Sequence, residues 1–524
     1  MKGLFNSTMV GIGVASAAGL AMNAGSCKAP GNNDQEVPPN IIYILADDLG
    51  YGDLGSYGQE MIETPNLDQL AEEGIRFTDH YSGSSVSAPA RCVLLTGKHS
   101  GKAQIRGNHE WDERGDVWNY EKVLLDSTLE GQYPMRPETV TIGSVLQGAG
   151  YKTAMFGKWG LGAPHTQSIP TRKGFDYFVG YNCQRQAHTY YPVHLYHNEQ
   201  RFSLNNDTLP PGTHLPEDAD PYDPANYDLF TSNNYAPTVM FDSIISFVNQ
   251  NDPVSTGDPF FIYWATPIPH VPLQAPQRWI DYYVDKFGDE EPFSGDGLYF
   301  PARYPRATYA AMVSYLDENI GLLIEQLKEM EIYDNTLIIF TSDNGPTFNG
   351  GSDSPWFDSG GPFKSEFGWG KAFLREGGIR VPMIASWPAH IEGGQTSGHI
   401  SAFHDVLPTL SEIAETGTPE QTNGISFLPE LTGGNQPGHE YLYWEQPPNQ
   451  QAVRMDKWKG IRTNIREGDL SIELYNLEED IQEQHNVADQ HPEIIQEMET
   501  IMQNARTEPE IEQFRMEALG DRPR

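Results

Sequence analysis

Cysteine is scarce in this chain of 524 residues, which contains only three. Apart from Cys27 near the start, the chain offers Cys92 and Cys183, so at most one disulfide can form. This excludes a small fold held together by a disulfide framework. A chain of this length has enough apolar residues to bury a large core without one. We therefore expect Cys92 and Cys183 to be small buried side chains.

Basic residues are also few. Lys and Arg number 34 against 72 Asp and Glu, and the formal net charge is −38. Such an acidic chain is unsuited to bind nucleic acid, whose phosphates it would repel. An anionic small substrate would need a local island of positive charge. No apolar run beyond the N-terminal segment is long enough to span a bilayer.

The N-terminal segment resembles an export signal, with Lys2 followed by a short apolar stretch from Met9 to Ala21. Ala24-Gly25-Ser26-Cys27 then resembles the lipobox of bacterial lipoproteins, in which the cysteine is lipidated. An ordinary secretory signal with an incidental cysteine is the alternative, but cysteine is rare here and stands where the motif requires it. We expect a signal peptide over 1–26 and a tether over 27–38. The protein would be exported and lipid-anchored, at the cell surface or in the periplasm, and would meet the membrane only through this anchor.

Four continuous apolar runs predict buried strands, and helical patterns lie between them. This alternation predicts an α/β fold, with a large, mainly parallel sheet between helices over 39–432. After Gly433 the pattern changes to short strands and one helical run, which predicts a small C-terminal α+β subdomain with an antiparallel sheet over 433–524. The predicted buried strands are Asn40–Ala46, Lys152–Phe156, Pro259–Ala265 and Thr336–Ser342, and the clearest helical patterns are Leu67–Glu73, Tyr309–Met330 and Pro492–Ala505.

Oxygen-bearing side chains follow two of the predicted strands. Asp47 and Asp48 come directly after the first, and Asp343 and Asn344 after the last. In parallel sheets, ligands bind beyond the carboxyl ends of the strands, where three carboxylates would repel one another without a cation. Oxygen ligands favour calcium, and the lack of Cys or His at these strand ends argues against zinc. A turn or a helix cap is the alternative interpretation of each acidic pair.

A candidate nucleophile is Ser87, in the segment Ser87-Ala88-Pro89-Ala90-Arg91 before an apolar helical run. Arg91 lies one helical turn further on, so both side chains can face one pocket. A helix cap is the alternative interpretation of Ser87. A serine hydroxyl is a weak nucleophile unless something activates it.

Together these segments resemble the type I sulfatases of the alkaline phosphatase superfamily, over nearly the whole mature chain. Any one motif is weak, but several in the right order make chance an unsatisfactory explanation. The matching segments are Asp47-Asp48, Thr64-Pro65-Asn66-Leu67-Asp68, Ser87-x-Pro89-x-Arg91, Gly157-Lys158-Trp159, Pro269-His270, Ser342-Asp343-Asn344-Gly345, Gly370-Lys371, Glu376–Pro382 and Glu473–Leu477.

The resemblance implies that a maturation enzyme oxidises Ser87 to formylglycine. One hydroxyl of the hydrated aldehyde would attack sulfur, and the other would later expel sulfate. One calcium ion would be held by Asp47, Asp48, Asp343, Asn344 and the residue at 87. Lys158 and Lys371 would contact sulfate oxygens, Arg91 would stabilise the hydrated aldehyde, and His270 would protonate the leaving oxygen.

The sequence departs from the family at Gly160, where the family usually has a histidine after Gly-Lys-Trp. His188, in the segment Gln186-Ala187-His188-Thr189-Tyr190, is a candidate replacement and a candidate substrate contact. This aromatic segment could stack on sugar rings, or it could be a packed loop. Arg106, which follows the Ser87 segment, is expected to steady the nucleophile loop or to contact sulfate.

The resulting prediction is a sulfuric ester hydrolase acting on a sulfated glycan, such as fragments of algal or host polysaccharide. One alternative is a phosphate or phosphonate ester hydrolase on the same fold. The other is a catalytically impaired relative that binds sulfated glycans without hydrolysing them, for which Gly160 is the only support.

Overall fold

Strand β1 (Asn40–Ala46) lies in the middle of a large sheet in the computed structural model, which describes residues 38–523. The predicted signal peptide, Cys27 and most of the tether lie outside the described residues. Within residues 38–523 the sheet has ten strands in the order β11-β2-β10-β9-β1-β8-β4-β5-β6-β7. The further strands are β2 (Ile75–Phe77), β4 (Lys152–Lys158), β5 (Tyr177–Tyr181), β6 (His194–His197), β7 (Gln200–Ser203), β8 (Phe260–Ala265), β9 (Thr336–Ser342), β10 (Met383–Ser386) and β11 (Gln395–Ser397).

The central strands β9, β1, β8, β4 and β5 are parallel, as predicted, while β10, β6 and β7 pair antiparallel with their neighbours. Alternate residues of β1 enter different cores. Ile42 and Ile44 belong to one apolar cluster, and Ile41 and Tyr43 to the other. Both faces of the strand are therefore covered, which explains why its sequence is a continuous apolar run.

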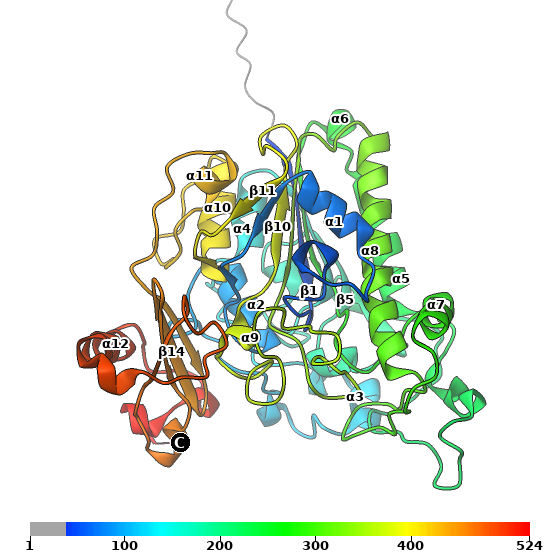
Figure 1. Cartoon of the computed structure of the whole chain (residues 1–524). Helices are drawn as coiled ribbons and strands as arrows, with labels where there is room; N and C mark the ends of the chain where they lie inside the picture. Colours follow the sequence, from blue (N-terminus) through cyan, green and yellow to red (C-terminus); the bar gives the residue numbers. More distant parts are fainter. Residues whose placement is uncertain (1–37, 524) are drawn as a thin grey trace, which may run out of the picture. The chain divides into compact units, whose positions relative to one another are not determined.

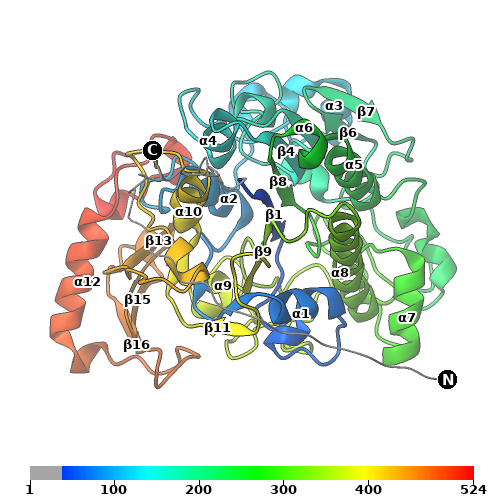
Figure 2. The ribbon, with the colours of Figure 1, turned by 90° about the horizontal axis from the view of Figure 1, so that it is seen from above.

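Helices cover both faces, and Figure 2 shows α1, α5 and α8 on one side of the sheet and α2, α4 and α10 on the other. Helix α8 begins at Pro305, earlier than predicted, because proline suits the first turn of a helix. The helices are α1 (Pro65–Glu72), α2 (Ser87–Thr96), α3 (Tyr120–Leu125), α4 (Ile142–Gly148), α5 (Ala236–Gln250), α6 (Pro253–Thr256), α7 (Gln277–Phe287), α8 (Pro305–Glu329), α9 (Glu376–Ile379), α10 (Val406–Ile413), α11 (Leu428–Leu431) and α12 (Pro492–Asn504).

A separate antiparallel sheet, β13-β14-β15-β16, lies near the C-terminus with α12 packed against it, as predicted (Figure 1). Buried ion pairs join this sheet to the larger part of the fold: Arg106 with Glu445 and Glu376 with Lys459. Its strands are β13 (Leu442–Gln446), β14 (Gln450–Met455), β15 (Trp458–Arg462) and β16 (Glu473–Asn476), and β3 (His80–Tyr81) pairs with β12 (Ser401–Ala402) elsewhere.

Two further expectations concern cysteine and the membrane. Cys92 and Cys183 are both buried and neither is in a disulfide, as the sequence predicts. None of the helices between residues 38 and 523 combines the length and the apolar character needed to cross a membrane.

Candidate active site

The acidic residues after β1 and β9 meet at one edge of the sheet. Ala46 is paired with Ser342, so Asp47 and Asp343 follow side by side. All four predicted side chains are fully buried. The backbone N–H of Asp48 donates to Asp343 Oδ1 at 3.2 Å, and Asn344 Nδ2 donates to Asp48 Oδ1 at 2.8 Å. The register of two parallel strands therefore assembles the predicted cluster of oxygen atoms.

Ser87 joins this cluster from the start of α2. It is the first residue of the helix rather than its cap, which is Val86, and its hydroxyl donates to Asp47 Oδ1 at 2.9 Å. Arg91, one turn further on, donates to Asp343 Oδ2 through Nε and Nη2 at 3.1 and 2.9 Å. The two side chains thus face the same pocket, as their spacing predicts.

Two lysines supply the positive charge. Lys158 is the last residue of β4, and its Nζ lies 2.6 Å from Asp47 Oδ2 and 3.5 Å from Ser87 Oγ. Lys371 Nζ donates to Asp48 Oδ2 at 2.6 Å. The loop that carries Lys371 is tied to the nucleophile segment, because the N–H of Ala372 donates to the carbonyl of Ser85.

Burial strongly affects ionisation here. Burial and the neighbouring Asp47 raise the pKa of Asp343 to about 7. Burial also opposes ionisation of Asp47, but Lys158, His270 and Arg91 outweigh it and hold the pKa of Asp47 below its ordinary value. The pKa of Asp48 is raised by burial, against the influence of Lys371. Several carboxylates buried together favour the binding of a cation.

The donor atoms fit calcium. Asn344 Oδ1 is buried and accepts no hydrogen bond from any residue between 38 and 523, so an oxygen ligand is free for an ion. The other donors around it are carboxylate oxygens, which calcium prefers. A ring nitrogen of His270 lies within 4.8 Å of carboxylate oxygens of Asp47 and Asp48. His270, expected at the leaving oxygen, is therefore also near enough to the acidic pair to offer a nitrogen ligand.

His270 and His188 lie face to face at this edge. Their ring centroids are 5.3 Å apart with planes 18° from parallel, and His270 Nε2 is 3.7 Å from Asp48 Oδ2. Nδ1 of His270 contacts the carbonyl of Val271, so this nitrogen carries the proton and Nε2 is left for the site. Burial lowers the pKa of both histidines well below the ordinary value. The structure therefore brings His188, the candidate replacement, into the site.

The space expected for the family's histidine is filled by another side chain. Gly160 has φ +70°, and a Cβ added there would lie 2.5 Å from Cγ and 2.6 Å from Nε2 of Gln184. Gln184 belongs to a short 3-10 helix, η5 (Gln184–Ala187), that immediately precedes His188. Gly160 is thus part of a local arrangement that includes Gln184 and His188.

Arg106 is not brought into the cluster. Its guanidinium donates to Glu445 Oε1 at 2.6 Å, to the carbonyls of Ala103 and Thr507, and to Thr507 Oγ1. These contacts use four of its five N–H groups to attach the C-terminal part of the chain, so the guanidinium serves this attachment and not the acidic cluster. The nucleophile segment is instead steadied by Asn108, whose Oδ1 accepts from the N–H of Ala88 at 2.8 Å.

Tyr299 also lies beside the two histidines, although the sequence does not predict it there. Its ring centroid is 5.6 Å from that of His188 and 6.3 Å from that of His270. No apolar pattern or motif marks this tyrosine in the sequence, because a long irregular connection carries it to the histidines.

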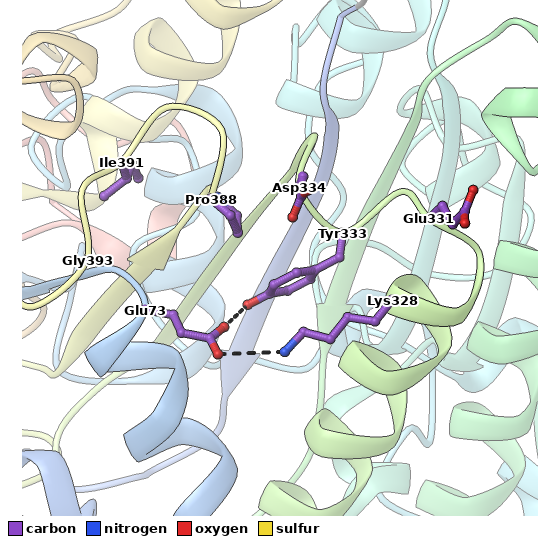
Figure 3. Close-up of a pocket in the computed structure, with 8 residues that line it drawn as sticks. All are labelled: Glu73, Lys328, Glu331, Tyr333, Asp334, Pro388, Ile391 and Gly393. Carbon is purple, nitrogen blue, oxygen red and sulfur yellow. Dashed lines mark hydrogen bonds and ion pairs between the residues drawn. The ribbon is translucent and has the colours of Figure 1, made fainter. Parts of the chain in front are cut away.

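A surface hollow of about 590 Å³ lies at the opposite end of β9 (Figure 3). The hydroxyl of Tyr333 and Nζ of Lys328 both contact the carboxylate of Glu73 there. This hollow borders the amino end of the strand, whereas the acidic cluster follows its carboxyl end. It is therefore separate from the candidate active site.

A buried hydroxyl between a lysine and paired carboxylates, at the carboxyl edge of a parallel sheet, defines a hydrolase of anionic esters. The family model "Sulfatase" matches residues 39–416, and "N-sulphoglucosamine sulphohydrolase, C-terminal" matches residues 365–508. Arylsulfatase A of Bos taurus is 32% identical over 436 residues, covering 80% of this chain and 74% of that protein. N-acetylgalactosamine-6-O-sulfatase of Bacteroides thetaiotaomicron is 28% identical, covering 92% and 95%.

Among solved structures, that of Ps i-CgsB is similar with a TM-score of 0.69 and 26% identity, covering 90% of this chain and 94% of that one. A phosphonate monoester hydrolase of Agrobacterium radiobacter shares the fold with a TM-score of 0.60 at 17% identity, covering 89% and 95%. The chain belongs to the sulfatase family. It is a sulfuric ester hydrolase with the alkaline phosphatase-like fold that its motifs predict.

Proposed function

We propose that this sulfatase hydrolyses sulfate esters of carbohydrates, with formylglycine made from Ser87 and one bound calcium ion. The observation that carries the proposal is the position of Ser87 Oγ, 2.9 Å from Asp47 and 3.5 Å from Lys158. A group attached at this position has acidic metal ligands on one side and an ammonium group on the other. A maturation enzyme would be required, because oxidising a serine side chain is not chemistry that these neighbours supply.

Asp47, Asp48, Asp343 and Asn344 would hold the calcium, which would neutralise charge on the sulfate oxygens and at the nucleophile. Lys158 and Lys371 would bind two of those oxygens as negative charge grows in the transition state. Arg91 holds Asp343 in place by donating to its carboxylate.

The aldehyde supplies a nucleophile once a water molecule adds to it. One of its two hydroxyl oxygens would form a bond to sulfur while the bond from sulfur to the alcohol oxygen breaks. The departing alcohol takes a proton. Loss of the proton from the second hydroxyl then breaks the carbon–oxygen bond to sulfate and restores the aldehyde. The net reaction consumes one water.

His270 is positioned to handle the proton of the leaving oxygen. In the free protein, burial and then Lys371 and Lys158 lower the pKa of His270, so the ring is neutral. An incoming sulfate ester brings negative charge and favours protonation of Nε2. His188, stacked on His270, is the residue we assign to the role left open by Gly160.

The names of several relatives favour a carbohydrate over a simple aryl ester. The Bacteroides protein is named for N-acetylgalactosamine-6-sulfate, and Ps i-CgsB has been crystallised with k-i-k-neocarrahexaose. We further propose export and lipid anchoring at Cys27, on the basis of the lipobox-like residues in the sequence.

The first test is mass spectrometry of the peptide that contains residue 87, from protein made in a host with the maturation enzyme. Formylglycine makes that peptide two hydrogens lighter than serine. The same preparation is then assayed on sulfated oligosaccharides and matched phosphate esters, with Ser87→Ala as control. Sulfate release that Ser87→Ala abolishes supports the proposal. Preference for phosphate esters, or glycan binding without sulfate release by fully modified protein, would overturn it.

A further inference from the structure

Helix η5 borders the active site at both ends. Gln184 at its start fills the space beside Gly160, two residues after Lys158. His188, which follows its end, is stacked on His270. Arg185 and Gln186 lie between these two contacts, so their side chains start from backbone that forms the border of the site.

Arg185 is unlike the other arginines and lysines of the site. Its side chain is only 6% exposed, and none of Nε, Nη1 and Nη2 has a hydrogen-bond partner among residues 38–523. By contrast, Arg91, Lys158 and Lys371 each donate to a carboxylate. A buried charge without a partner is unfavourable for folding, so its presence needs a reason beyond stability.

The nearby acidic group does not supply the missing partner. Glu110 is close enough to be influenced by Arg185, yet its carboxylate accepts from Gln132 Nε2 and lies 3.6 Å from Cys183 Sγ instead. The contact that Arg185 does make is with Trp118, whose ring centroid lies 5.1 Å from the guanidinium carbon. The guanidinium therefore remains free to bind an anion.

The residues on either side of Arg185 in the chain also carry donors without a partner. Nε2 of Gln184 and Nε2 of Gln186 are buried without a hydrogen-bond partner among the described residues. A cation accompanied by amide N–H groups is complementary to a negatively charged group with several oxygens. Trp118, which covers Arg185, is 60% exposed and offers an aromatic face of the kind on which sugar rings stack.

We propose that Arg185, with Gln184 and Gln186, forms a subsite for a second anionic substituent of the glycan, either a sulfate or a uronic acid carboxylate. This second anionic substituent lies on the same glycan, near the sulfate that is cleaved. Trp118 shifts from the guanidinium to admit it and packs against the sugar. This inference rests on the proposed function, because it concerns the substrate of the same site.

The test compares two oligosaccharides that share the cleavable sulfate, one with a second sulfate nearby and one without. A third oligosaccharide with a carboxylate at that position distinguishes the two anion types. The measured quantity is the ratio of kcat/KM for the doubly anionic substrate to that for the singly anionic one. Arg185→Gln is expected to lower this ratio ten- to a hundredfold, the range of a lost charged hydrogen bond.

Arg114→Gln is the matched control, because its guanidinium already donates to the carbonyls of Glu130 and Pro164. It should leave the ratio as in wild type. The melting temperature of Arg185→Gln should stay close to that of wild type, since the change removes no protein hydrogen bond and only the contact with the Trp118 ring. A wild-type ratio near one, or equal losses on both substrates in Arg185→Gln, would overturn the inference.

Failure of the proposed function can be distinguished from failure of the proposed subsite. If modified wild type releases sulfate from none of these substrates, the proposed function fails. The subsite is then judged from the ratio of Kd values for the same oligosaccharides, measured by calorimetry on Ser87→Ala and on Ser87→Ala/Arg185→Gln. A second anion that does not tighten binding, or tightens it equally in both proteins, contradicts the subsite.

Discussion

Gly160→His restores the residue usual in the family, and the structure predicts that it destabilises this protein. Gly160 has φ +70°, where a residue with a Cβ costs about 1–2 kcal/mol. The new Cβ would also meet Gln184 at 2.5 Å, and crowding a packed site costs about 1–3 kcal/mol. The combined loss in the free energy of unfolding is therefore about 2–5 kcal/mol.

The two contributions can be separated. Gly257 has φ +79° and nothing within 4 Å of an added Cβ, so Gly257→Ala measures the backbone cost alone. Gln184→Ala removes the crowded side chain. The double variant Gly160→His/Gln184→Ala should recover the crowding cost while keeping the backbone cost, which a double-mutant cycle measures as a coupling energy.

The assay is urea-induced unfolding of the four proteins in the cycle, with refolding checked because large proteins often unfold irreversibly. Where refolding fails, unfolding rates at one urea concentration replace the free energies. A Gly160→His protein as stable as wild type would refute the reasoning. A double variant no more stable than the sum of its single changes predicts would refute the role assigned to Gln184.

Three other changes probe the remaining groups. Burial raises the pKa of Glu110 from 4.5 to about 7, so the folded state holds this proton more tightly than the unfolded state. The free energy of unfolding of wild type should therefore fall by about 3 kcal/mol as the pH rises through that range, and Glu110→Gln should remove this fall. Identical pH profiles of urea unfolding for the two proteins would contradict this prediction. Arg106→Met removes one charged partner of buried Glu445, which keeps Arg506 and the hydroxyl of Tyr443, so it should lower the free energy of unfolding by about 1.5–3 kcal/mol without changing KM. Unchanged stability with a raised KM would return Arg106 to the substrate site. Asp343→Asn should weaken calcium binding by more than about tenfold, as measured by calorimetry. An unchanged calcium affinity would show that Asp343 is not a ligand of the metal.

The large sheet and part of the site follow from local sequence. A continuous apolar run that ends in acidic residues marks a strand buried on both faces, and parallel neighbours bring such ends to one edge. This reasoning alone places Asp47 beside Asp343. Ser87 and Arg91 share a pocket because they are one helical turn apart. Lys158, Lys371 and His270 were found only through the family resemblance, since one lysine or histidine differs from another only after its surroundings are known.

Three arginines show that the local sequence does not predict which groups a side chain contacts. Arg91 and Arg106 lie fifteen positions apart, yet one donates to Asp343 at the active site and the other to Glu445 in the C-terminal sheet. Arg185 immediately precedes Gln186 and is close to His188, but its lack of a partner depends on Glu110 and Trp118, which come from a distant loop.

The sequence by itself determined the α/β class, the closeness of the acidic residues at the strand ends and the family, because these depend on apolar periodicity, strand polarity and short motifs. Only the tertiary structure decided that Gln184 occupies the space beside Gly160, that Arg106 serves the C-terminal sheet and that buried Arg185 has no hydrogen-bond partner between residues 38 and 523. The physical reason is that the charge and hydrogen bonding of a side chain are set by the atoms packed around it. Those atoms come from segments far away in the chain, whose approach no local pattern specifies.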